Sequence, residues 1–241
     1  MTERDLSFKG VQISTLGAVV LEQPRLKRGE ERLKEATVPG RSGVLHLAEG
    51  DRVLSQYPMT AVIGLPEGMS YADRAALLAL LQGEGTVIFG SDESHAYEAV
   101  VTGALELEAI LEGREWDQFS VVFSCQPYRY HLPEAADITL TGAALIDNPG
   151  TADAAPLYAI TGTGEVYFSV GSESVFIDFG ETERTLVLDA ETQMAFLSDY
   201  SARADGDIEG GIPLIPAGSG NAVSWTGTVS AAVITPRWRD L

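Results

Sequence analysis

Residues 119–130 read Phe-Ser-Val-Val-Phe-Ser-Cys-Gln-Pro-Tyr-Arg-Tyr, and this stretch decides how the chain is divided. Apolar residues alternate with serine, valine and glutamine, and a period of two predicts a strand with one buried face. Pro127 has no N–H for a sheet ladder, so we predict that the strand stops there. A stretch rich in proline and alanine follows at residues 131–136. We therefore expect one domain to end close to Tyr130.

The residues before this strand predict an antiparallel β domain that carries one helix. Ser70 is a suitable N-cap with Asp73 three residues later, a run of alanines and leucines follows, and Gly83 ends the helix. Short strand-like runs surround it, separated by glycine and proline turns. They lie at residues 11–13, 17–21, 43–47, 59–65, 86–89, 97–101, 104–110 and 116–125. The arrangement is α+β and not alternating βαβ.

The residues after this strand predict a β-sandwich. Short apolar runs are separated by Gly, Asn, Asp and Pro at a spacing of about ten residues, which is typical of that class. They lie at residues 138–140, 157–162, 166–170, 175–179, 185–189, 194–196 and 222–230. Two glycines in Thr161-Gly162-Thr163-Gly164 have dinucleotide-loop spacing, but a strand and not a helix follows them. We predict a hairpin at this point and no Rossmann fold.

The charge of the chain is strongly negative and unevenly distributed. The net charge is −19; residues 1–52 carry nine basic and eight acidic side chains, and residues 53–241 carry seven and twenty-seven. A surface this acidic repels phosphate backbones, which argues against nucleic-acid binding beyond the first fifty or so residues. The mixed cluster at residues 25–35 has two interpretations: a solvated hairpin, or a segment that faces an acidic surface on a neighbouring subunit.

The sequence also limits the compartment and the chemistry. No apolar run approaches the roughly eighteen residues that span a bilayer, and residues 1–5 lack a secretion-signal pattern. We therefore expect synthesis and folding in a cytoplasm. The one cysteine, Cys125, lies on the apolar side of its strand and is predicted to be a core thiol. The histidines His46, His95 and His131 lie in unrelated segments and match no metal motif. We expect no catalytic, cofactor-binding or metal residues.

Three groups of residues carry weaker alternatives. Acidic residues at Glu106, Glu108, Glu112, Glu115 and Asp117 allow a glycosidase-type pair, but they fit an exposed strand and turn better. Residues 205–209, Asp-Gly-Asp-Ile-Glu, are either a short calcium loop or, by preference, a solvated turn. The aromatic residues of the second domain are either a sugar-stacking platform or, by preference, core. They are Tyr158, Tyr167, Trp225 and Trp238.

Five segments, taken in order, resemble the siphophage distal tail protein (Dit) family. Residues 38–45 are similar to its Pro-Gly-Arg-x-Gly signature, and residues 119–130 resemble the segment that closes its ring-forming domain. Residues 148–157 look like the Asn-x-Gly…Pro opening of its second domain. Residues 212–223 resemble its Pro-x-Leu…Gly-x-Asn turn, although Ser219-Gly220 adds a residue, and residues 235–239 resemble its basic closing strand.

The resemblance implies a mainly β protein of two domains. Residues 1–132 would be the ring-forming domain, or belt, and residues 133–241 a galectin-like or carbohydrate-module-like β-sandwich, with about the last 10–20 residues returning to the first domain. The family implies a hexameric ring, single or back to back, at the tip of a long non-contractile tail. Its partners would be the tail tube protein and tail-fibre or receptor-binding proteins, without nucleic acid or membrane. The expected location is the virion tail tip.

These expectations describe a structural hub and not an enzyme. The alternative function is a carbohydrate-binding sandwich that aids host adsorption. A ring closes when one face of a subunit joins a different face of the next. We therefore hypothesise that residues 22–65, around Pro39-Gly40, form a projecting hairpin that grips the adjacent subunit.

Overall fold

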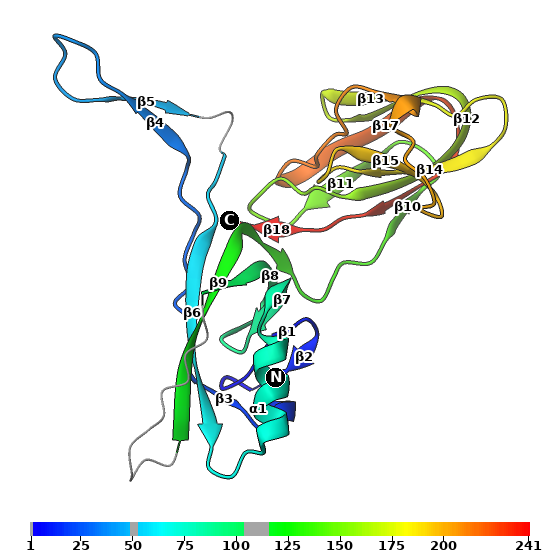
Figure 1. The fold of residues 1–241 in the computed structure, drawn as a ribbon. Helices are drawn as coiled ribbons and strands as arrows, with labels where there is room; N and C mark the ends of the chain where they lie inside the picture. The colour runs from blue at the N-terminus through cyan, green and yellow to red at the C-terminus, as the bar shows by residue number, and fades with distance from the viewer. Residues whose placement is uncertain (1, 49–52, 104–115) are drawn as a thin grey trace. The chain divides into compact units, whose positions relative to one another are not determined.

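The computed structural model describes residues 2–48, 53–103 and 116–241 (Figure 1). The chain divides into two compact units. One spans Met1–Arg129 and includes Leu241, and the other spans Tyr130–Asp240. The structure is mainly β with one α-helix in the described ranges, which confirms the predicted fold class. Among the described residues, no helix has both the length and the apolarity to cross a bilayer.

The first unit is built on a curled antiparallel sheet. Its strands follow the order β2-β1-β7-β8-β9-β6-β3, and β18 also pairs with β9. A short 3-10 helix, η1 (Ile13–Leu16), joins β2 to β3. The strand bounds are β1 Leu6–Phe8, β2 Val11–Gln12, β3 Val19–Glu22, β6 Tyr57–Pro66, β7 Gly83–Phe89, β8 Asp92–Thr102 and β9 Trp116–His131. The strand predicted at residues 104–110 lies outside the described residues.

Strand β9 provides the centre of the core of the first unit. Its alternating side chains at positions 119, 121, 123 and 125 are all buried, as the alternation predicts. Phe123 meets the edges of Phe8 and Phe89, with ring centroids 5.6 Å apart in each case. Edge-to-face aromatic pairs of this kind add stability beyond the area they bury. The strand that divides the sequence is thus also the one on which the first core is assembled.

The prediction that β9 stops at Pro127 is wrong, because the strand continues to His131. The ladder with β6 ends at the pair Tyr57 and Cys125, so Pro127 lies beyond the last residue pair on that side. A proline there costs no hydrogen bond to β6, and its fixed φ is compatible with extended backbone. Pro127 therefore marks the end of the pairing between β9 and β6, and β9 itself continues beyond it.

The predicted helix is present as α1, Tyr71–Leu80. The Ser70 hydroxyl accepts the backbone N–H of Asp73 at 3.1 Å, which is the expected N-cap. Leu77 and Leu81 are fully buried in the core of the first unit. The helix therefore packs by one face, while Tyr71 at its start is 88% exposed.

The second unit is an eight-stranded sheet that folds into a sandwich. A second short 3-10 helix, η2 (Asp205–Asp207), precedes β16. The strand bounds are β10 Ile138–Leu140, β11 Ala144–Asn148, β12 Leu157–Val170, β13 Glu173–Asp178, β14 Arg184–Asp189, β15 Met194–Leu197, β16 Ile208–Glu209 and β17 Gly218–Thr235. Strand β18 (Arg239–Asp240), which pairs with β9, is not part of this sheet. The long strands β12 and β17 pair with each other and belong to both halves of the sandwich. One half adds β10, β14 and β15, and the other adds β11, β13 and β16.

The two halves of β12 contribute to the same core. Tyr158 from the first half and Phe168 from the second are both fully buried, and their ring centroids lie 5.0 Å apart. The hairpin predicted at Thr161–Gly164 is wrong, because β12 runs continuously through these residues. The register with β17 shifts on both sides of Thr163, so the glycines mark irregularities in one strand and not a reversal.

We predict that Phe123→Ala destabilises the first unit by about 3–5 kcal/mol, because it removes a buried ring from between Phe8 and Phe89. Urea unfolding followed by circular dichroism measures the change. Val11→Ala, at a residue that is 40% exposed, is the control and should leave the midpoint nearly unchanged. Equal midpoints for the Phe123 variant and the parent would contradict the assigned core.

Candidate functional site

An exposed hairpin in the first unit is the first candidate site. Strands β4 (Leu33–Ala36) and β5 (Leu45–Ala48) form a two-stranded sheet of their own (Figure 1). No residue from 31 to 47 is buried. The tip reverses at Pro39-Gly40, where Arg41 N–H donates to the Val38 carbonyl at 3.1 Å and Gly40 has φ of 82°. This hairpin falls within the predicted segment 22–65, of which residues 49–52 lie outside the described ranges.

The two sides of the hairpin carry different side chains. Directly opposite residues of an antiparallel pair project to the same side, and the sides alternate along each strand. Ala36, Leu45, Lys34 and Leu47 lie on one side, and Glu35, His46 and Leu33 lie on the other. Leu45, Leu47 and Leu33 are 36%, 47% and 47% exposed. The first side therefore presents two leucines to solvent beside Lys34, and the second presents one leucine beside Glu35 and His46.

The base of the hairpin is fixed to the first unit. Arg32 N–H donates to the Val53 carbonyl and Ser55 N–H donates to the Glu30 carbonyl, both at 2.8 Å. Gly29 is buried beside them, and a Cβ placed on it would lie 2.7 Å from the Ser55 carbonyl oxygen and 3.1 Å from Pro127 Cβ. Only a residue without a side chain fits so close to backbone. The hairpin thus starts from a rigid root beside β9.

A buried polar cluster surrounds Asp92 in the first unit. Tyr97 O–H donates to its carboxylate at 2.6 Å, and Ser94 O–H and His95 Nδ1 lie 2.9 and 2.8 Å from the other oxygen. Arg129 Nη1 is 3.5 Å away. Burial raises the pKa of Asp92, but hydrogen bonds from His95, Tyr97 and Ser94 outweigh it and hold the pKa below its usual value. The ionised carboxylate joins the start of β8 to the end of β9.

The histidines and the cysteine occupy structural positions. His46 lies 3.9 Å from Glu35 on the hairpin, and His131 Nε2 lies 3.1 Å from an Asp240 oxygen. Cys125 is fully buried, as predicted, and burial raises the pKa of its thiol to about 12. A thiol with so high a pKa is protonated near neutral pH and is a poor nucleophile.

The weaker sequence alternatives are resolved in part. Asp117 lies 3.0 Å from Arg74, and the other four acidic residues of that group lie outside the described ranges. In the acidic turn, Asp205 binds Arg203 and accepts the Ala195 N–H, and Asp207 lies 3.1 Å from Arg184. These carboxylates are neutralised by arginine, so the calcium alternative is disfavoured and the turn is an ion-paired one.

The hypothesis that Tyr158, Tyr167, Trp225 and Trp238 form a sugar-stacking platform is wrong. Tyr158 is fully buried and donates its hydroxyl to the Pro213 carbonyl at 2.9 Å. Trp225 stacks on Phe168, and Trp225 and Trp238 pack against the core. Tyr167 alone of the four is exposed, at 51%. The sequence analysis did not separate it from the others, because the hairpin predicted at Thr161–Gly164 kept the alternation of β12 from being followed from Tyr158 to Tyr167.

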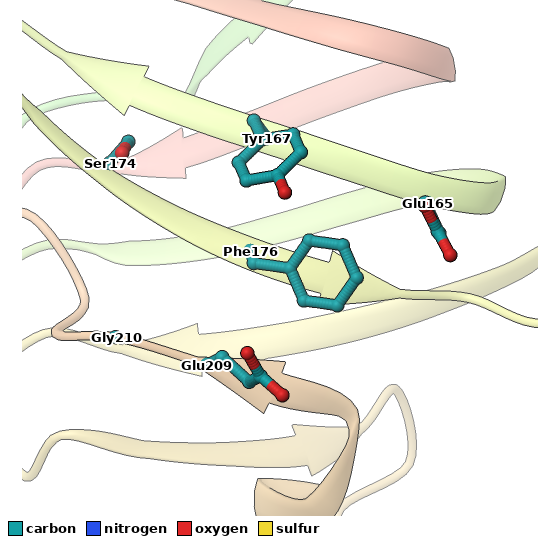
Figure 2. Close-up of a pocket in the computed structure, with 6 residues that line it drawn as sticks. All are labelled: Glu165, Tyr167, Ser174, Phe176, Glu209 and Gly210. Atoms are coloured by element: carbon teal, nitrogen blue, oxygen red, sulfur yellow. The ribbon is translucent and has the colours of Figure 1, made fainter.

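Tyr167 belongs to an open groove of about 490 Å³ on the outer side of the sandwich (Figure 2). Tyr167 pairs with Phe176 across β12 and β13, and Phe176 pairs with Glu209 across β13 and β16. The Tyr167 and Phe176 rings lie 5.1 Å apart and are tilted by 57°. Glu165, Ser174 and Gly210 complete the lining. The sequence analysis missed this site, because its residues come from three strands and meet only through the sheet register.

Comparison with known proteins identifies the fold. No protein-family model and no curated protein matches the chain. The crystal structure of the Dit protein of phage SPP1, described as a paradigm of the hub adsorption apparatus of phages that infect Gram-positive bacteria, matches with a TM-score of 0.72 and 12% identity, over 98% of this chain and 99% of that one. The chain has the fold of a distal tail protein.

Two baseplate structures of phage p2 in its activated conformation also contain chains of similar fold. These chains match with TM-scores of 0.52. The structure with Ca has 7% identity over 97% of both chains, and the structure with Sr has 6% identity over 97% of this chain and 98% of that one. At such identities the shared property is the fold alone.

We predict that Asp92→Asn destabilises the first unit by about 1–3 kcal/mol near neutral pH, because the amide cannot replace a carboxylate that accepts three bonds. A lowered native pKa stabilises the fold above the unfolded-state value and loses that effect as pH falls through the native value. The difference from the parent should therefore shrink below about pH 4. Urea unfolding of the parent and the variant, near neutral pH and below about pH 4, measures the difference in stability. Glu84→Gln, at an exposed residue, is the control. A difference that grows in acid would refute the argument.

We predict that the Cys125 thiol of the folded protein reacts far more slowly than a free thiol. A pKa raised from 9.0 to about 12 lowers the thiolate population near pH 8 about a thousandfold, and burial blocks access as well. Iodoacetamide labelling followed by mass spectrometry measures the rate, with the denatured chain as control. Equal labelling rates in the folded and denatured chain would exclude a core thiol.

Proposed function

We propose that this protein is a structural hub of a long non-contractile phage or prophage tail tip, located in the virion. It forms a hexameric ring, single or back to back, that joins the tail tube to baseplate, tail-fibre or receptor-binding proteins. The observation that carries the proposal is the Dit fold over 98% of the chain. Residues 1–132 would make the ring, and residues 133–241 would form the outer sandwich, with the last residues returning to the first domain.

The exposed hairpin supports assembly through unlike surfaces. A closed ring requires each subunit to present one surface and accept it with another. The side of the hairpin that carries Leu45 and Leu47 presents both leucines to solvent in a single chain. Burying the exposed part of these two side chains against a neighbour contributes about 1–3 kcal/mol before the costs of association. The hairpin is therefore the element that we assign to gripping the adjacent subunit.

The role that we propose is not enzymatic. In the described part of the chain, Asp117, Asp205 and Asp207 are paired with arginine, and Tyr158, Trp225 and Trp238 belong to the core or pack against it, while Tyr167 is exposed. The alternative, a carbohydrate-binding module, depended on an aromatic platform of which Tyr158 is fully buried. A structural hub accounts for the exposed hairpin, which a sugar module does not need.

The purified protein tests this function directly. Light scattering should give a mass six times that of the 25.7 kDa chain, or twelve times for back-to-back rings, and negative-stain images should show rings. A protein that remains a monomer at high concentration would count against the hub.

We predict that Leu45→Ser combined with Leu47→Ser abolishes the ring or weakens its assembly at least tenfold, because each serine removes a buried contact worth more than about 1 kcal/mol. Light scattering over a dilution series measures the effect. The matched control is Glu35→Ser with His46→Ser on the opposite side of the same hairpin. The control variant should still form the ring. If both double variants lose assembly, or if neither does, then Leu45 and Leu47 do not make the specific contact with the adjacent subunit.

A further inference from the structure

The groove around Tyr167 joins an exposed and a half-buried aromatic ring to carboxylates. Tyr167, Phe176 and Glu209 lie directly opposite one another on β12, β13 and β16. Glu165 stands two residues before Tyr167 and so projects from the same side of β12. Figure 2 shows the two rings next to each other, with the two glutamates beside them. Within the described residues, neither glutamate side chain takes part in a hydrogen bond or ion pair, whereas Asp205 and Asp207 are both paired with arginine.

The surroundings of the groove favour a positively charged occupant. Residues 130–240 carry sixteen acidic side chains, four arginines and no lysine. Each arginine already has a carboxylate partner. These pairs are Arg184 with Asp207, Arg203 with Asp205, Arg237 with Asp189, and Arg239 with Glu191. The potential over this surface therefore repels anions and concentrates cations.

The chemistry of the lining favours an organic cation over a metal ion. Glu165 and Glu209 stand on strands that are two spacings apart, about 10 Å, and Phe176 lies on the strand between them. Carboxylates held this far apart do not converge on one ion, and aromatic rings are not ligands for hard cations. A guanidinium or ammonium group, in contrast, is attracted both by ring faces and by carboxylates.

The openness of the groove favours a side chain of a protein over a free small molecule. Small-molecule sites bury most of the surface of their ligand, and this groove is shallow with its lining residues mostly exposed. A side chain that projects from a partner is anchored by the rest of that partner and needs no enclosed cavity. Guanidinium also stacks on aromatic rings and pairs with carboxylates at interfaces.

We propose that the groove formed by Glu165, Tyr167, Phe176 and Glu209 docks a partner protein through an arginine or lysine side chain. The aliphatic stem packs on Tyr167 and Phe176, and the charged head binds Glu165 or Glu209. The proposal rests on the hub function, for which it supplies the chemistry of one partner surface. Any adsorption protein that binds here carries a basic residue at the contact.

A peptide probe tests the groove on the full-length protein. The probe is a short glycine-serine peptide with one central arginine, and the matched probe carries citrulline, which has nearly the same shape without the charge. Saturation-transfer NMR, which observes the peptide and tolerates large assemblies, should detect the arginine peptide and not the citrulline peptide. Added salt should weaken the signal, because exposed charge pairs are screened.

Variants locate the binding site. Tyr167→Ala should weaken binding of the arginine peptide about two- to fivefold. Glu165→Gln with Glu209→Gln should weaken it by a similar factor for each charge removed. Glu183→Gln, which removes one charge from an exposed residue outside the groove, should leave binding unchanged. Equal binding of the citrulline peptide, insensitivity to the groove variants, or preferential binding of a neutral methyl glycoside would each overturn the proposal.

Light scattering on the same variants separates this inference from the proposed function. If the parent and the Glu165→Gln, Glu209→Gln variant both form rings but neither binds the arginine peptide, the groove proposal fails and the hub remains. If the parent binds the peptide as a monomer and forms no ring, the hub proposal fails and the groove is a cation site in its own right.

Discussion

Strands β12 and β17 pair along most of their lengths, and the second unit depends on that pairing. Each strand contributes its two ends to different halves of the sandwich, so the core closes only if both strands bend at the same place. Gly162 and Gly227 lie at this bend, and a Cβ on Gly162 would approach the Thr228 carbonyl oxygen to 2.6 Å. Gly227 has φ of 94°, which side-chain-bearing residues rarely adopt. The backbone of these glycines allows Tyr158 and Phe168 to meet.

The sequence predicted local features where one segment contained all the information. The alternation from Phe119 to Cys125 and the Ser70 cap each depend on neighbours along the chain, and both are confirmed. Prediction from the sequence failed where pairing with another strand decides whether a strand ends or continues. Pro127 does not end β9, because the β6 ladder is already finished. Likewise the glycines at 162 and 164 do not reverse the chain, because β17 continues to pair beyond them.

The groove around Tyr167 also depends on strand pairing that the sequence alone does not show. Tyr158 and Tyr167 are nine residues apart in β12, an odd number, so alternation along the strand places Tyr158 in the core and Tyr167 on the surface. The sequence analysis predicted a hairpin between them, so the alternation could not be followed from one to the other. Glu209 reaches the site only through β16, a strand of two residues that no periodicity reveals. The uneven charge, in contrast, could be read directly from the sequence, which already indicated a strongly acidic surface after residue 52.

The tight contact at Gly29 has a consequence for the evolution of the hairpin. Because the root is held by backbone hydrogen bonds and by a close approach to Ser55 and Pro127, the fold of the first unit is indifferent to what lies beyond it. Doubling the length of a loop costs only about 0.6 kcal/mol in closure entropy. Residues beyond the root can thus lengthen, shorten or change composition without retuning the core. The root thus separates the core of the first unit from a segment whose length and composition that core does not restrict.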